Sequence, residues 1–419
     1  MRAIYGFLTI ALLVVLATAE QAAAAAPALF TANDDRDDTR GIQLYLDSLK
    51  GPETHGRPPL PAGRLLISDT LKIRKTMGYR LAGSGGVNRS PSDGWDPHRV
   101  GTILVWTGPP DKPMLEISGC SGMVIEGINF DGPASAGILI RSGEGSLNFA
   151  IRDCGFLGQA VGIQCGTSYR EGSCANITYD SCHFEALTEA CVRMVNAHSV
   201  QHLFLRPLFV DSPVGIDMAA GGVMAVVGGG AYELDTFLRL GRQGSNNRGF
   251  NVQGFRFDGR GTRTQWLAFA DPRRTRTFGT ITFANCSQSH GQKQSNEPLI
   301  TVAPGSRVVV RECSFSAAPL AGGNLAHVYS DRRASGELIV ENCDGLVADK
   351  LPDYVRTHGD RAYYTFTRCG SLYDQSASAS NFPANGWSAN ELQNLRELAN
   401  LDPGELRSLV EALRESDAP

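Results

Sequence analysis

The chain has 419 residues, of which 42% are hydrophobic and 20% are charged, so it can bury a large core. Its formal net charge is -4, which gives no reason to expect nucleic acid as a partner. The 47 glycines and 21 prolines indicate many turns.

Residues 1–26 are predicted to be a signal peptide followed by an Ala-rich segment. Arg2 precedes an apolar stretch over residues 7–19 that is too short to span a bilayer comfortably. Ala17, Thr18 and Ala19 form a small-x-small cleavage site, and the alternative is an uncleaved membrane anchor. We expect a secreted or periplasmic protein with no integral membrane segment after signal cleavage.

Residues 27–100 are expected to form an N-terminal cap and the first coils of a repeat. A capping helix is predicted within residues 34–51, begun by Asp or Thr, ended by Gly51, and apolar on the side that holds Ile42, Leu44 and Leu46. The stretch GRLLISDTLKI at residues 63–73 is typical of two extended strands.

A repeat occupies residues 101–372. The stretches NFAIRDCGF (148–156), NITYDSCHF (176–184) and RVVVRECSF (307–315) share an apolar alternation that ends in Cys-x-Phe. Copies recur with a period of roughly 20–30 residues, which indicates a solenoid. One residue of each copy aligns in a column: Ile128, Cys154, Cys182, Pro207, Gly230, Phe255, Cys286, Cys313, Cys343 and Cys369.

A second short strand follows each copy, and single units of this kind bury their apolar side only by stacking on neighbours. The sequence therefore predicts an all-β fold, a right-handed parallel β-helix of about ten coils. The recurrent cysteines are expected to point into the core as thiols, because free Cys behaves there as a small hydrophobe. Cys165 and Cys174 close a short loop, and both a disulfide and two thiols stay open for them.

The C-terminal part departs from the repeat. Residues 373–386 are small and polar and are interpreted as a linker. Residues 387–419 are predicted to be a helical hairpin with apolar stripes, begun by Ser388. It is expected to cover the solenoid, and the alternative is a docking or oligomerisation element.

The combination of the segment at residues 37–51, the strands at 63–73 and YRLAGSGG at 79–86 resembles the entry to the pectate lyase superfamily. The resemblance implies a helix-capped parallel β-helix over most of the chain. It also implies that substrate binds along the sheet made by the second strands. It is specific for the fold and less so for activity, since the superfamily includes lyases, hydrolases and members without known catalysis.

Alternation along the second strands predicts which side chains face outward. We call the predicted outward set the central row: Glu116, Leu139, Gln164, Arg193, Asp217, Arg239, Ala268, Thr301, His327 and Arg356. Arg193, Asp217 and Arg239 fall on three consecutive coils and are the predicted catalytic residues. Two arginines suit a uronate carboxylate and can stabilise the anion formed when a neighbouring proton is removed. The alternative is a structural ladder of cross-strand ion pairs.

Substrate binding is predicted for Gln164 and His327 of this row, for Arg141 in a neighbouring row and for Trp266, whose ring could stack on a sugar. No metal-ligand spacing occurs, so no metal site is predicted; the cofactor stays unknown, with calcium open. The leading hypothesis is a secreted polysaccharide-processing protein, a lyase acting on an acidic polysaccharide. The alternative is a noncatalytic glycan-binding or cell-envelope β-helix protein.

Overall fold

The computed structural model describes residues 30–49, 58–85, 101–132, 136–141, 146–241, 249–258, 264–272, 279–289, 297–315, 325–369 and 379–380. The predicted signal peptide and Ala-rich segment (1–26) and the predicted helical hairpin (387–419) lie outside these residues. So does most of the predicted linker (373–386).

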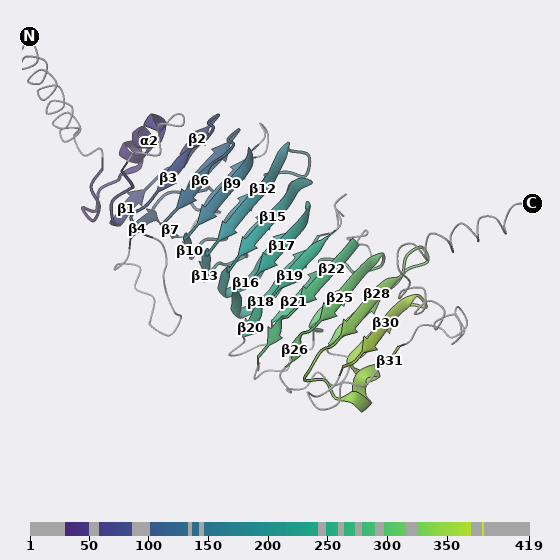
Figure 1. The fold of residues 1–419 in the computed structure, drawn as a ribbon. Coiled ribbons are helices and arrows are strands. Elements are labelled where there is room, and N and C mark those ends of the chain that lie inside the picture. Colours follow the sequence, from purple (N-terminus) through teal and green to yellow (C-terminus); the bar gives the residue numbers. More distant parts are fainter. Residues whose placement is uncertain are drawn as a thin grey trace, which may run out of the picture.

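The chain winds into the right-handed parallel β-helix that the sequence predicts, and successive coils stack their strands side by side (Figure 1). Each coil contributes strands to three parallel ladders. Ladders one and two are joined into one 19-stranded sheet, because β16 (Leu208–Met218) and β18 (Gly230–Leu240) run through both. Ladder three is a separate 12-stranded sheet.

Ladder one contains the first parts of β16 and β18 together with β1 (Gly63–Ile67), β4 (Thr102–Trp106), β7 (Ile128–Asp131), β10 (Gly155–Leu157), β13 (His183–Glu185), β20 (Arg256–Asp258), β23 (Ser287–Gln288) and β26 (Ser314–Phe315). Ladder two contains the last parts of β16 and β18 together with β2 (Leu71–Arg74), β5 (Leu115–Ser118), β8 (Ile138–Arg141), β11 (Val161–Cys165), β14 (Ala190–Met194), β21 (Gln265–Phe269), β24 (Ile300–Val302), β27 (Ala326–Tyr329) and β29 (Val355–His358).

Ladder three contains β3 (Arg80–Ala82), β6 (Val124–Glu126), β9 (Ser146–Arg152), β12 (Ser173–Asp180), β15 (His198–Leu205), β17 (Gly222–Val227), β19 (Phe250–Gln253), β22 (Gly279–Ala284), β25 (Ser306–Arg311), β28 (Gly336–Glu341), β30 (Ala362–Thr367) and β31 (Ala379–Ser380). β31 pairs antiparallel with β30 and falls in the range predicted as linker. The 3₁₀-helix η3 (Ala348–Tyr354) precedes β29.

The helix α2 (Thr39–Ser48) caps the first coil within the predicted range. Ile42 and Leu46 are buried, as expected for the apolar side, but Leu44 is 48% exposed. Including Leu44 on that side was wrong, because residues four apart share a helix face and residues two apart do not.

The start of α2 is tied to the first coil through Asp38. This residue occupies the N-cap position, but its side chain makes no capping hydrogen bond. Its carboxylate instead accepts hydrogen bonds from the N–H groups of Leu66 (3.1 Å) and Thr31 (3.3 Å). The polar residue that the sequence indicates as a helix cap therefore fastens the helix to β1.

A sharp corner joins ladder three to the segment that enters ladder one in each coil. The corner residue adopts a positive φ, which Gly and Asn tolerate best. This corner position holds Gly127, Asp153, Ser181, Arg206, Gly228, Gly254, Asn285, Glu312, Asn342 and Arg368. The column that the repeat reveals comes one residue after this corner.

The cysteines of this column have a common role. Each is buried, and each thiol donates to a backbone carbonyl of the preceding coil; Cys182, for example, donates to Ile151 at 3.4 Å and Cys369 to Val340 at 3.4 Å. A small apolar side chain with a weak S–H donor fits this buried place. The predicted inward thiols are confirmed for the six cysteines of the column.

The predicted column is wrong by one residue at Gly230. Leu208 pairs with Gly230, so the residue beside Pro207 is Gly229. A Cβ on Gly229 would lie 2.2 Å from the carbonyl oxygen of Pro207, so only glycine fits there. The absence of a side chain at this position removes the pattern that marks the register in the other copies.

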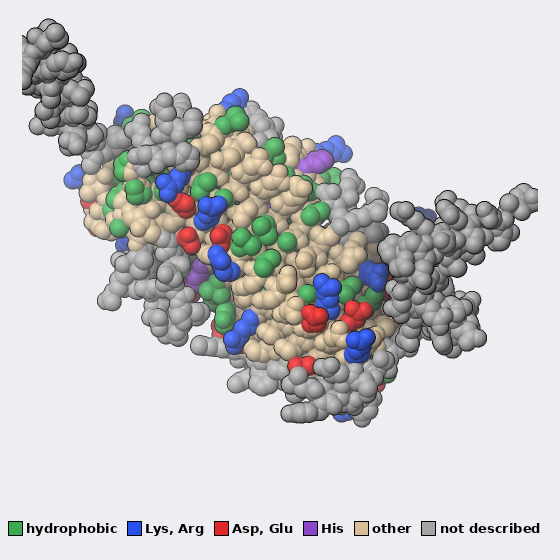
Figure 2. All heavy atoms as spheres, in the orientation of Figure 1, with side chains coloured by type: hydrophobic (Ala, Val, Ile, Leu, Met, Phe, Trp, Pro, Cys, Tyr) green, Lys and Arg blue, Asp and Glu red, His purple; other side chains and the backbone are tan. Residues whose placement is uncertain are grey.

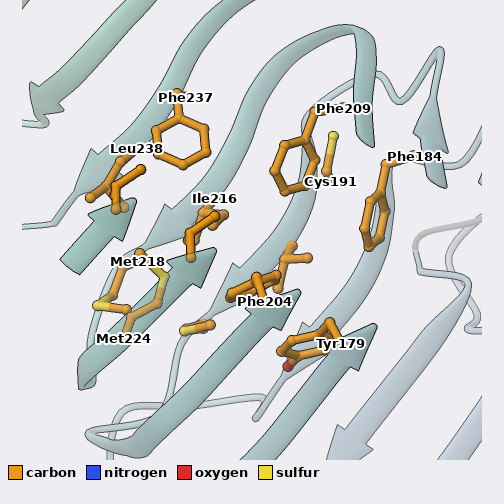
Figure 3. Close-up of a cluster of buried hydrophobic side chains, with 14 of the residues drawn as sticks. Tyr179, Phe184, Cys191, Phe204, Phe209, Ile216, Met218, Met224, Phe237 and Leu238 are labelled. Atoms are coloured by element: carbon orange, nitrogen blue, oxygen red, sulfur yellow. The ribbon is translucent and has the colours of Figure 1, made fainter. Parts of the chain in front are cut away.

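Aromatic rings stack along the interior from coil to coil. Phe130, Phe156, Phe184 and Phe209 follow one another with ring centroids 5.1, 4.9 and 5.4 Å apart. Figure 3 shows Phe184, Phe209 and Phe237 on one side of this core, with Tyr179 and Phe204 on another. Such stacks fill the interior continuously, which is why isolated coils could not be stable.

A buried polar network lies inside the same core. Cys165 and Cys174 do not form a disulfide, and the Cys174 thiol donates to the carbonyl of Ile140 at 3.4 Å. The Cys165 Sγ lies 3.5 Å from the Tyr179 hydroxyl, which is 3.1 Å from Nδ1 of His202. Burial lowers the pKa of His202 to about 3, so this imidazole is neutral in the folded protein.

The outer face of ladder three carries cross-strand ion pairs, and Figure 2, in the orientation of Figure 1, shows acidic and basic side chains adjacent on this face. Arg206 pairs with Asp180 at 2.7 Å, and Arg307 with Glu337 at 3.3 Å. Pairs of this kind on exposed strands contribute little to stability.

Candidate functional site

Ladder two places the central row as the sequence predicts. Strand pairing aligns Glu116 with Leu139, Gln164 with Arg193, Thr301 with His327 and so on through Arg356. Lys72 pairs with Glu116 and therefore begins the row one coil earlier. Side chains of one row lie on successive rungs, about 4.8 Å apart.

Arg193, Asp217 and Arg239 lie together on three successive rungs. The Asp217 Oδ2 accepts from Nε of Arg193 (3.2 Å) and from an Nη of Arg239 (2.8 Å), and its Oδ1 accepts from Nε of Arg239 (3.1 Å). The hydrogen bond with Asp217 raises the pKa of Arg239 above its usual value. Asp217 is buried, with both of its oxygens occupied by guanidinium donors.

Glu189 completes this cluster, and the sequence analysis missed it. Its carboxylate lies 2.7 Å from an Nη of Arg193 and its side chain is 52% exposed. Glu189 directly precedes β14, where strand alternation no longer predicts the direction of a side chain. An acidic residue four positions before an arginine was the only signal available.

A second cluster lies nearer the N-terminal cap. Glu116 is 3.4 Å from Arg74 and 3.8 Å from Arg141, and Arg141 is also 3.8 Å from Glu171. Glu171 comes from the loop after β11, where its carboxylate also accepts from the Thr167 hydroxyl at 2.8 Å. Arg141, a predicted substrate-binding residue, thus lies at the surface between two carboxylates.

The two clusters share an uneven exposure of their charges. The carboxylate side chains of Asp217, Glu116 and Glu171 are 11–13% exposed, whereas those of Arg239, Arg141 and Arg74 are 38–56% exposed. These three acids lie beneath the guanidinium groups, whereas Glu189 is 52% exposed beside Arg193, which is 22% exposed. An approaching molecule therefore meets the guanidinium groups of Arg74, Arg141 and Arg239 together with one exposed carboxylate, that of Glu189.

The other predicted binding residues of the row are also on the surface of ladder two. Gln164 is half-buried and its amide donates to the carbonyl of Gly166 at 3.0 Å. His327 is half-buried, and its imidazole lies edge-on to that of His358 with centroids 5.2 Å apart. Burial, and then the nearby His358 and Arg356, lower the pKa of His327.

Trp266 does not lie on this surface, and its predicted role in sugar binding is wrong. The side chain is fully buried, its Nε1 donates to Oε1 of Gln288 (2.8 Å), and its ring stacks on Phe257 at 4.5 Å. Alternation would turn it outward with Ala268, but at the start of β21 two successive side chains, Trp266 and Leu267, are both buried. The same holds for Phe237 and Leu238 on the preceding coil.

Within the described residues, no group of three or more metal-ligating side chains could hold a metal ion. In the same part of the chain, no helix has the length and apolar character required to cross a membrane.

No family model and no curated protein matches the chain. Among solved structures it is similar to ORF18 of Geobacillus virus E2, with 12% identity and a TM-score of 0.39 over 84% of this chain and 62% of that one. The chain thus spans less than two thirds of the viral protein. It is also similar to PfbA, a surface adhesin of Streptococcus pneumoniae, with 11% identity and a TM-score of 0.33 over 82% of this chain and 87% of that one.

A third similar structure is a hyperthermoactive exopolygalacturonase from Thermotoga maritima, with 8% identity and a TM-score of 0.39 over 84% of this chain and 91% of that one. Identities at this level concern the fold alone. The three ladders of parallel strands themselves show that the chain has the right-handed parallel β-helix fold of pectin lyase-like proteins.

Proposed function

We propose that the chain is an exported protein that binds an acidic polysaccharide lengthwise along the central row of ladder two. The observation that carries the proposal is the layering of charge in which the exposed guanidinium groups of Arg74, Arg141 and Arg239 lie above the less exposed carboxylates of Glu116, Glu171 and Asp217. Arginine offers paired donors in a fixed geometry that matches the carboxylate of a uronate. Arg193 and Arg239 on the central row, and Arg74 and Arg141 on the neighbouring row, make this offer at several rungs along ladder two, as a linear polymer requires.

Binding to polygalacturonate, alginate and hyaluronate tests the proposal. Arg141→Gln and Arg239→Gln should each weaken binding of the preferred polymer about tenfold, the loss expected for one charge-assisted hydrogen bond. Arg206→Gln is the matched control, because it removes an exposed arginine at the corner that follows β15 of ladder three, outside ladder two. Equal loss in all three variants would indicate nonspecific attraction, and no binding by the wild type would remove the proposal.

A second candidate is cleavage of the bound polymer by β-elimination, with Arg193, Asp217 and Arg239 at its centre. The exposed carboxylate of Glu189, 2.7 Å from Arg193, favours it, since it is a base beside an anion-stabilising guanidinium. Glu189 would take the proton next to the uronate carboxylate. The electron pair left behind forms a double bond as the glycosidic C–O bond breaks, and the leaving oxygen gains a proton. Asp217, whose oxygens are both occupied, would hold the two arginines in place.

Absorbance of the unsaturated ends, measured with and without calcium, tests this candidate. Glu189→Gln should abolish the signal and leave polymer binding unchanged within a factor of two to three. A lyase that keeps its rate in this variant does not use Glu189 as its base. If the wild type binds the polymer but gives no absorbance change, the cleavage candidate is wrong and the polysaccharide-binding function remains.

Export is tested separately by the mass of the mature protein. If the predicted signal peptide is removed after Ala19, the mature chain begins at Glu20. A membrane-bound chain that retains Met1 would instead support the uncleaved anchor.

A further inference from the structure

A groove of ≈ 670 Å³ lies between α2 and the turn from β1 to β2. The side of α2 contributes Arg40, Gln43 and Leu44 to its lining, and β2 contributes Lys72 and Arg74. Because Lys72 is the residue that pairs with Glu116, the groove opens directly onto the central row. We call it the cap groove.

The helix closes the end of ladder two at this groove. The Gln43 amide donates to the carbonyl of Lys72 (3.0 Å) and its Oε1 accepts from the N–H of Lys72 (2.8 Å). The Gln43 side chain thus forms the hydrogen bonds that the backbone of Lys72, in the edge strand β2, would otherwise make with a further coil. A polymer lying along the central row would meet α2 here and could extend no further.

Three acidic groups line the cap groove, and each has a polar partner; Asp47 accepts from the Gln43 amide at 3.1 Å. Asp37 accepts from the hydroxyls of Thr39 (2.5 Å) and Ser68 (2.7 Å), and Asp69 is 3.0 Å from Nζ of Lys112. Within the described residues, the exposed side chains of Arg40 and Lys72 form no ion pair. They line the groove together with Leu44, whose exposed side chain is apolar.

From this arrangement we infer that the cap groove binds the terminal residue of the acidic polysaccharide, with the carboxylate between Arg40 and Lys72 and the sugar ring against Leu44. The inference rests on the proposed function and deepens it, since it assigns a chain-end site to one end of the row. Two cations that form no ion pair suit one carboxylate, although Lys72 also interacts electrostatically with Asp69. The apolar side chain of Leu44 in the same groove suits the C–H face of a sugar ring.

Binding of short oligomers tests the inference separately from polymer binding. The probes are trigalacturonate and trimannuronate, titrated by calorimetry beside polygalacturonate and alginate. The Arg40→Gln/Lys72→Gln double variant should lose at least tenfold in affinity for the trimer, whereas Arg206→Gln, outside ladder two, should match the wild type. Leu44→Ser should lower the affinity for the trimer less and leave the unfolding midpoint unchanged, because this side chain is exposed.

The outcomes separate the two proposals. If the wild type binds polymer but not trimer, or if the double variant binds trimer as the wild type does, the cap groove is not a chain-end site and the proposed function stands. If neither polymer nor trimer binds, the proposed function itself is wrong and the inference falls with it.

Discussion

Asp217 accepts hydrogen bonds from two arginines at once. Asp217→Asn would leave Arg193 and Arg239, two rungs apart, with no carboxylate between them. We expect a loss of about 2 kcal/mol in the free energy of unfolding, the range of buried hydrogen bonds to charged groups. Urea unfolding measures it, with Asp180→Asn as the control, since the exposed pair Asp180–Arg206 should contribute only about 0.5 kcal/mol. Equal losses in the two variants would contradict the assignment.

For individual residues, the sequence predicts the direction of a side chain correctly inside a strand, where the alternation holds, and fails to do so where the alternation ends. Arg193, Asp217 and Arg239 lie mid-strand, where successive side chains point to opposite faces. Trp266 lies at the start of a strand and Glu189 lies before a strand, and neither place follows the alternation. Side-chain direction there depends on the local backbone conformation, which a single sequence does not reveal.

The corner elements give a stability test with a matched pair of glycines. Gly229 and Gly254 both have positive φ, but a Cβ on Gly229 would lie 2.2 Å from the Pro207 oxygen, whereas one on Gly254 meets nothing within 4 Å. Gly254→Ala should cost about 1–2 kcal/mol, the strain of the left-handed conformation alone. Gly229→Ala should cost at least twice as much in the same unfolding assay. Similar losses would show that the close approach of the coils can relax.

Two strands of ladder three share the Tyr179–His202 contact, which predicts a pH dependence. The unfolded chain takes up a proton at His202 below about pH 6.5, whereas the folded protein does so only near pH 3. Stability should therefore fall as the pH falls through this window, by up to about 1.4 kcal/mol per pH unit from this group. Denaturant unfolding at pH 6, 5 and 4 should give a flatter profile for His202→Gln than for the wild type. Parallel profiles would mean that His202 is protonated in the folded state.

The ends of the solenoid decide whether the whole molecule stays monomeric, because unpaired strand edges are present there. α2 covers the first edge through buried Ile42 and Leu46. Leu46→Asp should displace the helix and cause end-to-end association, seen as larger species by light scattering after size exclusion. Leu44→Asp, on the exposed side of the same helix, should stay at the wild-type mass. Wild-type behaviour of both variants would show that the helix is not required as a cap.

The architecture was predictable from the chain as a whole because each coil repeats the same local pattern, and the cysteine column fixed most of the register. The register of the copy that contains Gly229 was not predicted, because glycine carries no side chain to mark the column. The cap groove was not predicted because it is formed between a helix and a turn, and its shape depends on how they pack.

Arginine labelling tests whether the face of ladder two binds an acidic polysaccharide. A dicarbonyl reagent, applied with and without the preferred polymer and followed by peptide mass spectrometry, reports the accessibility of each guanidinium group. Bound polymer should protect Arg141, Arg239 and Arg356 on ladder two and leave Arg307 on ladder three, and Arg206 at the corner after β15, reactive. Protection of Arg206 and Arg307, with the arginines of ladder two still labelled, would contradict binding at ladder two.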